Sequence, residues 1–195
     1  MYNHNLVSTL LDKLLNYRNI SNGNAYILEL SKIYSVEKII FQLEKMLQSD
    51  TLQVFEALFF LRQVSITSRY ERSFNEVVEN FRKEIPKSRI FSLMEEHLYS
   101  TEEEIRSSVI YAFGKMTFPE QKKLLKKAID FYINQFPLQL GELLFEYFWL
   151  NGGVDINLLK VLAKDGNSEV KKGIEWFLDH ISDQEKASIK KELGF

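Results

Sequence analysis

The amino-acid sequence predicts an all-α protein, folded as a right-handed α-solenoid of about five to six helical hairpins. Apolar residues recur at positions i, i+3, i+4 and i+7 along the whole chain, which is the period of amphipathic helices. Residues that interrupt helices are few, with 8 Gly and 3 Pro among 195 residues. Similar helices also recur at a spacing in the low thirties, which is typical of stacked hairpins.

Capping and breaking residues mark where each helix begins and ends. Four segments match the capping box, in which a hydroxyl and a carboxylate bond the free amides of the first turn, and they begin at Ser68, Thr101, Thr117 and Ser182. Simple N-caps are predicted at Asp50 and Asp155, and helix breaks at Asn22-Gly23, Pro86, Pro137, Gly152-Gly153 and Gly166. In chain order these signals predict helices near 5–18, 24–34, 36–48, 51–66, 69–84, 88–99, 102–116, 119–135, 138–150, 155–164, 168–180 and 183–193.

One pattern of four apolar residues recurs in alternate helices. It starts at Ile27, Ala57, Val109, Leu140 and Ile174, which are separated by 30, 52, 31 and 34 residues. The helix predicted over 69–84 accounts for the longer second step. The residues at offsets 0, 3, 4 and 7 should form the core, and in the clearest copies they are Ala57, Phe60, Leu61 and Val64; Val109, Ala112, Phe113 and Met116; Leu140, Leu143, Leu144 and Tyr147; and Ile174, Phe177, Leu178 and Ile181.

The copy that begins Ile105-Arg106 continues as x-x-Val109-x-x-Ala112-Phe113-Gly114-x-Met116 and follows an acidic run, 102–104. This segment resembles the second helix of a HEAT repeat, and so does the helix that begins Val170-Lys171. The resemblance implies one HEAT-like repeat domain over residues 1–195. It also implies a curved scaffold that binds a partner on its concave face, which the second helices form, and it implies no particular activity.

The positions opposite the core of the second helices carry aromatic and acidic side chains. We predict these to be the partner-binding residues, namely Tyr111, Glu142, Phe145, Glu146, Trp149, Glu175, Trp176 and Asp179. Such a surface would suit a basic protein partner. Two alternatives stay open, because the aromatic residues could be buried by closer packing and the acidic ones could be simply solvated.

Composition narrows the classes of function. The formal net charge is -2, which makes nucleic acid an unfavoured partner, and the absence of Cys removes disulfides and thiolate chemistry. The apolar runs at 58–61 and 143–145 are too short to span a membrane, so we expect a cytoplasmic protein. No arrangement of the 3 His predicts a catalytic residue, a metal ligand or a bound cofactor.

The sequence therefore predicts a non-enzymatic protein-binding module, most concretely a bacterial immunity-type inhibitor of a basic toxin domain. A general scaffold or adaptor is an alternative. HEAT-like folds also include DNA glycosylases and bilin lyases. A glycosylase would need a basic groove, and a lyase would need a deep apolar cleft near Trp149 and Trp176.

Overall fold

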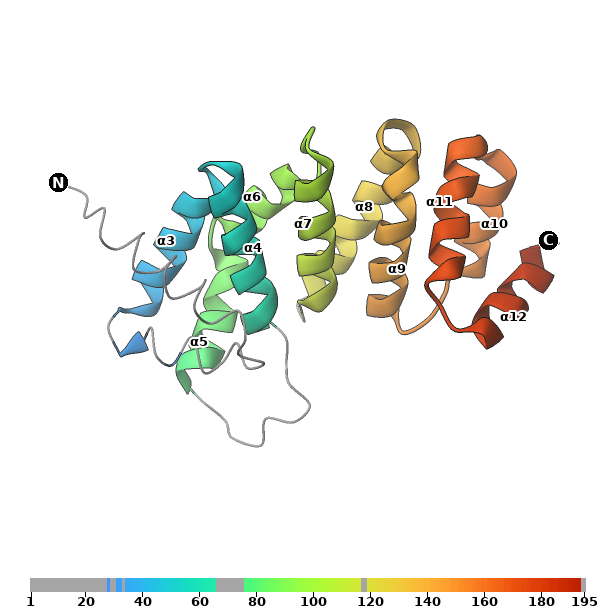
Figure 1. Ribbon diagram of the computed structural model, residues 1–195. Coiled ribbons are helices and arrows are strands. Elements are labelled where there is room, and N and C mark those ends of the chain that lie inside the picture. The colour runs from blue at the N-terminus through green and yellow to red at the C-terminus, as the bar shows by residue number, and fades with distance from the viewer. Residues whose placement is uncertain (1–27, 29–30, 33, 66–75, 117–118, 194–195) are drawn as a thin grey trace. The chain divides into compact units, whose positions relative to one another are not determined.

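The computed structural model describes residues 28, 31–32, 34–65, 76–116 and 119–193 (Figure 1). Within these ranges the regular structure is entirely helical, which confirms the predicted fold class. The chain divides into two compact units, Met1–Phe118 and Pro119–Phe195. A single repeat domain with a solenoid architecture stays a prediction. The helices expected over 5–18 and 24–34 lie, wholly or almost wholly, outside the described residues.

The described part of the first unit contains two helical hairpins and an additional helix. Its described elements are α3 (Val36–Leu47), α4 (Thr51–Ser65), α5 (Glu76–Glu84), the 3-10 helix η1 (Ile85–Lys87), α6 (Ile90–His97) and α7 (Glu103–Lys115). The α3–α4 hairpin packs on the α6–α7 hairpin, first helix on first and second on second. The additional helix predicted between the hairpins is confirmed over its described part, α5.

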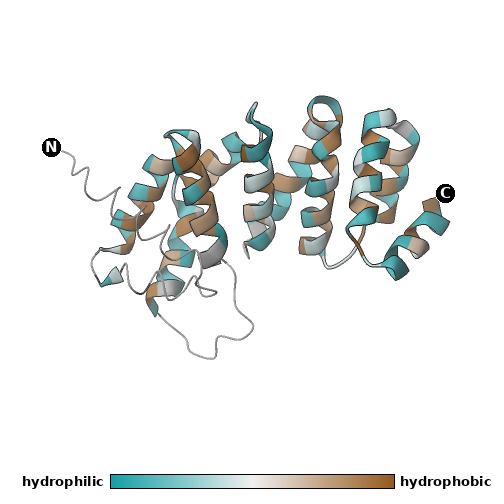
Figure 2. Ribbon diagram, viewed as in Figure 1, coloured by the Kyte–Doolittle hydropathy of each residue, from teal (hydrophilic) through white to brown (hydrophobic). Residues whose placement is uncertain are grey.

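The second unit repeats the hairpin arrangement. Its elements are α8 (Pro119–Gln135), the 3-10 helix η2 (Pro137–Gln139), α9 (Leu140–Asn151), α10 (Ile156–Asp165), α11 (Ser168–Asp179) and α12 (Asp183–Leu193). Helix α9 packs against α8 and also against α11, the second helix of the next hairpin, and α10 packs against α11 and α12. Hydrophobic and hydrophilic residues alternate along these helices, as the bands of Figure 2 show.

Three of the four predicted caps that the structure describes are confirmed, those at Asp50, Asp155 and Ser182, and Asp50 Oδ1 accepts from the Gln53 amide at 3.0 Å. The Ser182 hydroxyl and the Glu185 carboxylate form the expected capping box at α12, and Asp155 Oδ1 accepts from the Leu158 amide at 3.1 Å. The capping box predicted at Thr101 is wrong. Helix α7 starts at Glu103 with no side-chain cap, and the Ser100 hydroxyl instead accepts from the Glu102 amide at 3.1 Å.

The helix stop predicted at Gly152-Gly153 is also confirmed. Gly152 adopts φ 73°, the left-handed conformation in which a glycine commonly ends a helix, and the Gly153 amide bonds the Phe148 carbonyl at 3.1 Å. Ser68 and Thr117, which begin the other two predicted capping boxes, lie outside the described residues.

The predicted core is confirmed in every copy of the repeat that the structure describes. The described anchors of α4, α7, α9 and α11 are buried, as are the residues at offsets 3 and 4 from each of them. At offset 7, Met116 and Tyr147 are buried, and Ile181 is half-buried just beyond the end of α11. Ile27 and the side chain of Val64 lie outside the description.

Among the described helices, none is both long enough and apolar enough to cross a lipid bilayer.

Candidate partner-binding surface

A row of aromatic and acidic side chains lies along one side of α9. Glu142, Phe145 and Trp149 are spaced i, i+3 and i+7, so they share a face of the helix. Glu142 and Phe145 are half-buried, whereas Trp149 is 68% exposed. An exposed indole of this kind contributes little to a core and is a common anchor at protein interfaces.

A second row on α11 joins the first through a close contact between helices. Glu175 and Asp179 are exposed and Trp176 is half-buried. A Cβ built on Gly141 of α9 would lie 2.8 Å from Trp176 Cε3, so the indole lies directly against that glycine. We call Glu142, Phe145, Trp149, Glu175, Trp176 and Asp179 the acidic aromatic surface.

Glycines at this contact let the two main chains approach. The same Cβ on Gly141 would lie 2.5 Å from the Gly173 carbonyl oxygen, and one on Gly173 would lie 2.6 Å from the Pro137 carbonyl oxygen. Real Cβ atoms do not come this close to a carbonyl oxygen, because the repulsion is too strong. The positions of both rows of side chains therefore depend on these two glycines.

The prediction that Glu146 lies on the outer face is wrong, because its side chain is only 3% exposed. Helix α9 packs against α8 as well as α11, so its buried arc is wider than a one-sided helical wheel allows. That arc includes Leu143 and Glu146, which are three residues apart, and it is continued by buried Gln139 at the end of η2, four residues before Leu143.

The carboxylates of the acidic aromatic surface differ in how they are compensated. Lys186 of α12 forms an ion pair with Asp179, and its hydrogen bond, followed by its charge, lowers the pKa of that carboxyl below the usual 3.8. Within the described part of the chain, no cation pairs with Glu142 or Glu175. These two carboxylates are thus available to a positively charged partner.

Trp176 has a second neighbour on its own helix. The ring of His180 stacks on the indole, with centroids 3.7 Å apart and planes inclined by 16°. His180 Nδ1 lies 2.7 Å from the Trp176 carbonyl oxygen, which fixes the imidazole in that position. The stack covers part of the indole and accounts for its intermediate exposure.

Tyr111, the remaining predicted partner-binding residue, belongs to the first unit and lies beside cations. The residue is 40% exposed, with the Arg62 guanidinium 4.2 Å and the Lys115 ammonium 4.8 Å from its ring centroid. These contacts are cation–π interactions. The surroundings of Tyr111 are therefore basic and aromatic, unlike those of the acidic aromatic surface.

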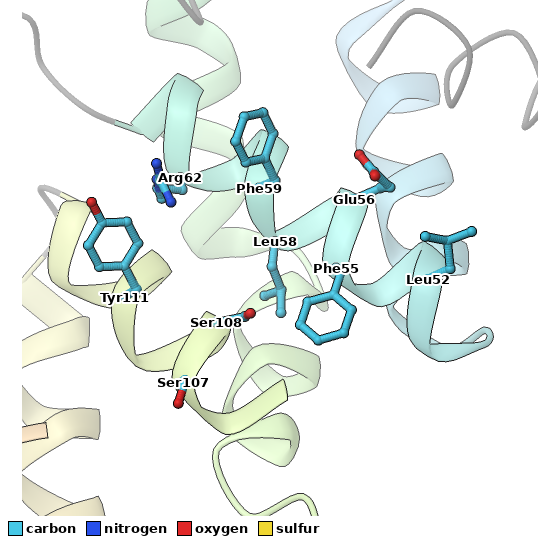
Figure 3. A pocket seen from close by; sticks show the side chains of 9 residues that line it. All are labelled: Leu52, Phe55, Glu56, Leu58, Phe59, Arg62, Ser107, Ser108 and Tyr111. Atoms are coloured by element: carbon cyan, nitrogen blue, oxygen red, sulfur yellow. The ribbon is translucent and has the colours of Figure 1, made fainter. Parts of the chain in front are cut away.

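A cavity of about 640 Å³ adjoins Tyr111 and was missed by the sequence analysis. It lies between α4 and α7, and Figure 3 shows the side chains that line it: Leu52, Phe55, Glu56, Leu58, Phe59, Arg62, Ser107, Ser108 and Tyr111. The sequence does contain a signal for this cavity, in the residues next to the anchors of the repeated apolar pattern. Leu58 and Ser108 stand at the positions that Gly141 and Gly173 occupy relative to their own anchors.

The described residues contain no group of three or more His, Asp or Glu side chains that could hold a metal ion. Comparisons of the chain with protein-family models, with curated protein sequences and with solved structures give no match.

Proposed function

We propose that this protein is a non-enzymatic protein-binding module whose acidic aromatic surface takes a basic segment of a partner protein. The observation that carries the proposal is the 68% exposed Trp149, in one row with Phe145 and with Glu142, which pairs with no cation in the described part of the chain. Leaving an indole in water forgoes roughly 1.5–3 kcal/mol of burial, which a partner would recover. We further propose that the stacked hairpins belong to a HEAT-like solenoid.

Charge supports the choice of a basic partner. Glu142 and Glu175 flank the aromatic residues, no described cation forms an ion pair with either, and the whole chain carries a formal net charge of -2. Complementary charge would speed the encounter and exclude acidic competitors. The most concrete version is an immunity-type inhibitor that covers a basic toxin domain, and a scaffold that holds a basic protein is its alternative.

The test is affinity capture with the purified full chain, using wild type, Trp149→Ala and Val161→Ala. Val161 on α10 is 56% exposed and serves as a matched control, because it also removes an exposed apolar side chain. We expect one protein to be captured stoichiometrically by wild type and Val161→Ala, and the Trp149→Ala affinity to fall about thirtyfold or more in calorimetry. Equal affinity of Trp149→Ala would contradict the proposal.

Charge and biological role are tested on the same pair of proteins. Replacing Glu142 and Glu175 together by Gln should weaken binding and flatten its dependence on salt. If the partner is a toxin domain, its expression alone should arrest growth, and co-expression of this chain should relieve the arrest. Relief by the Trp149→Ala variant to the same extent would argue against this surface.

A further inference from the structure

The cavity between α4 and α7 has features of a small-ligand site. Its volume of about 640 Å³ lies within the range of pockets that hold small molecules. Most of its wall is apolar, with Phe55 and Leu58 on α4 among the side chains that form it. Figure 3 shows Arg62 and Tyr111 together at one end and Phe55 towards the other, so the polar and apolar parts are separated.

The charged end is built around Arg62. Its guanidinium carbon lies 4.2 Å from the Tyr111 ring centroid and 5.4 Å from that of Phe59, so aromatic rings hold the group in place. Rings that stack on the faces of a guanidinium leave its N–H edge for a hydrogen-bonding partner. No carboxylate among the described residues pairs with Arg62. Glu56 also lines the cavity, but Phe59 lies between it and Arg62 in Figure 3.

The main chain of the cavity walls limits what kind of ligand fits. Both walls are helices, in which the amides and carbonyls bond within the helix and are not offered to a ligand. An extended peptide would therefore leave most of its own amide groups without partners, at a cost in affinity. A ligand with one anionic end and an apolar body has no such groups to satisfy.

We propose that this cavity binds a small carboxylate with an apolar alkyl or aryl body. The carboxylate accepts hydrogen bonds from the Arg62 guanidinium, and the body lies over Leu58 and Phe55. Arg62 and Phe55 are two helical turns apart, or roughly 10 Å, which is the length of a medium-chain acid. The site is separate from the acidic aromatic surface and does not rest on the proposed function.

The test titrates octanoate into the full chain by calorimetry and by saturation-transfer NMR. We expect octanoate to bind, and octanamide, which has the same body without the charge, to bind about tenfold or more weakly. Arg62→Gln should weaken octanoate by a similar factor and leave octanamide unchanged. Arg89→Gln, which removes an exposed arginine beside α6, should leave both affinities unchanged.

A second variant tests the apolar body and does not depend on the folding of Arg62→Gln. Ser108→Leu places a larger side chain at the wall of the cavity and should abolish binding of octanoate, with an unchanged circular dichroism spectrum. Trp149→Ala should bind octanoate as wild type does, because that residue belongs to the other unit.

Three results would overturn the proposal. The first is no binding of octanoate to the wild-type chain at millimolar concentration. The second is equal binding of octanoate to wild type and to either Arg62→Gln or Ser108→Leu. The third is tighter binding of a short peptide ending in a free leucine carboxylate, such as acetyl-Gly-Gly-Leu, which would make a chain terminus the ligand.

Discussion

The pairs α4–α7 and α9–α11 occupy corresponding places in the two units, and each is the most extensive contact between the described helices of its unit. Both pairs bury the same register of apolar anchors. Beside the anchors they differ, since Gly141 and Gly173 in the second unit are replaced by Leu58 and Ser108 in the first. The glycine pair brings main chain against main chain, and the leucine–serine pair borders a cavity.

This difference shows that the buried anchors and the surface between the helices are determined by separate residues. The anchors specify which face of each helix is covered. Two other residues specify whether the groove between the paired helices is closed or open. One follows the anchor of the first helix of the pair, and the other precedes the anchor of the second helix. Counted from the anchors, Arg62 corresponds to Phe145, and Tyr111 corresponds to Trp176. The open groove therefore has a cation at a position where the closed pair has an aromatic residue.

A large effect is expected from Gly141→Ala, which obstructs the closed pair. Alanine raises helix propensity by about 1 kcal/mol, but its Cβ would lie 2.5 Å from a main-chain oxygen that cannot move freely. We expect a net loss of about 1–3 kcal/mol of unfolding free energy in urea, and a change in Trp176 emission. The control is Gly153→Ala, whose Cβ would meet no atom within 4 Å. Equal stability of both variants would mean that the contact is not a constraint.

A smaller effect is expected from Arg62→Met in the open pair. Methionine keeps the apolar stem and removes the cation–π interactions with Phe59 and Tyr111. We expect a loss of about 1 kcal/mol, measured by urea unfolding followed by circular dichroism. Lys87→Met, at an exposed cation paired only with Glu84 on the surface, is the control and should change stability by less than about 0.5 kcal/mol.

Ser108→Leu sharpens the comparison, because it enlarges the residue that corresponds to Gly173. The cavity can accept the added side chain, so we expect a change in unfolding free energy within about 1 kcal/mol of zero. Gly173→Leu, by contrast, should unfold the second unit or destabilise it strongly, since even a Cβ would lie 2.6 Å from a carbonyl oxygen. Comparable losses in both variants would remove the distinction between open and closed pairs.

The smallest effect concerns pH and Asp179, at the end of the closed pair. The pKa of this carboxyl is lowered by Lys186, through a hydrogen bond and through charge, below the usual 3.8. The pair therefore stabilises the fold above about pH 3.8, and this contribution is lost as pH falls further through the folded-state pKa. Wild type should exceed Asp179→Asn in stability near neutrality and converge with it in acid. A constant difference across that range would contradict the assignment.

The helices could be predicted from sequence because their signals are local. Asp155, Ser182 and Gly152 each bond or bend the chain within a few residues, and a periodic apolar pattern needs no knowledge of neighbours. The capping box predicted at Thr101 is wrong because two hydroxyl side chains are adjacent in the sequence there. Ser100, one residue earlier, offers a competing hydroxyl, and the side chain that bonds the amide is decided by geometry.

The candidate site could be predicted only in part. Trp149, Glu175 and Asp179 are exposed as expected, because they lie on the helix faces opposite the buried anchors. Glu146 is buried because α9 packs against α8 as well as α11. How two helices pack is a property of the tertiary structure, and the pattern within one helix does not show it. The cavity was missed for a related reason, since the sequence of one helix alone does not show that Leu58 of α4 and Ser108 of α7 line the same space.

The two tryptophans of the chain, Trp149 and Trp176, both lie in the second unit. Indole emission during denaturation therefore follows that unit alone, while the amide signal of circular dichroism sums over every helix. Coincident transitions by the two probes would identify a single cooperative species, and separated ones would give each unit its own melting curve. Because both tryptophans lie in one unit, the unfolding of that unit can be measured separately without attaching any label.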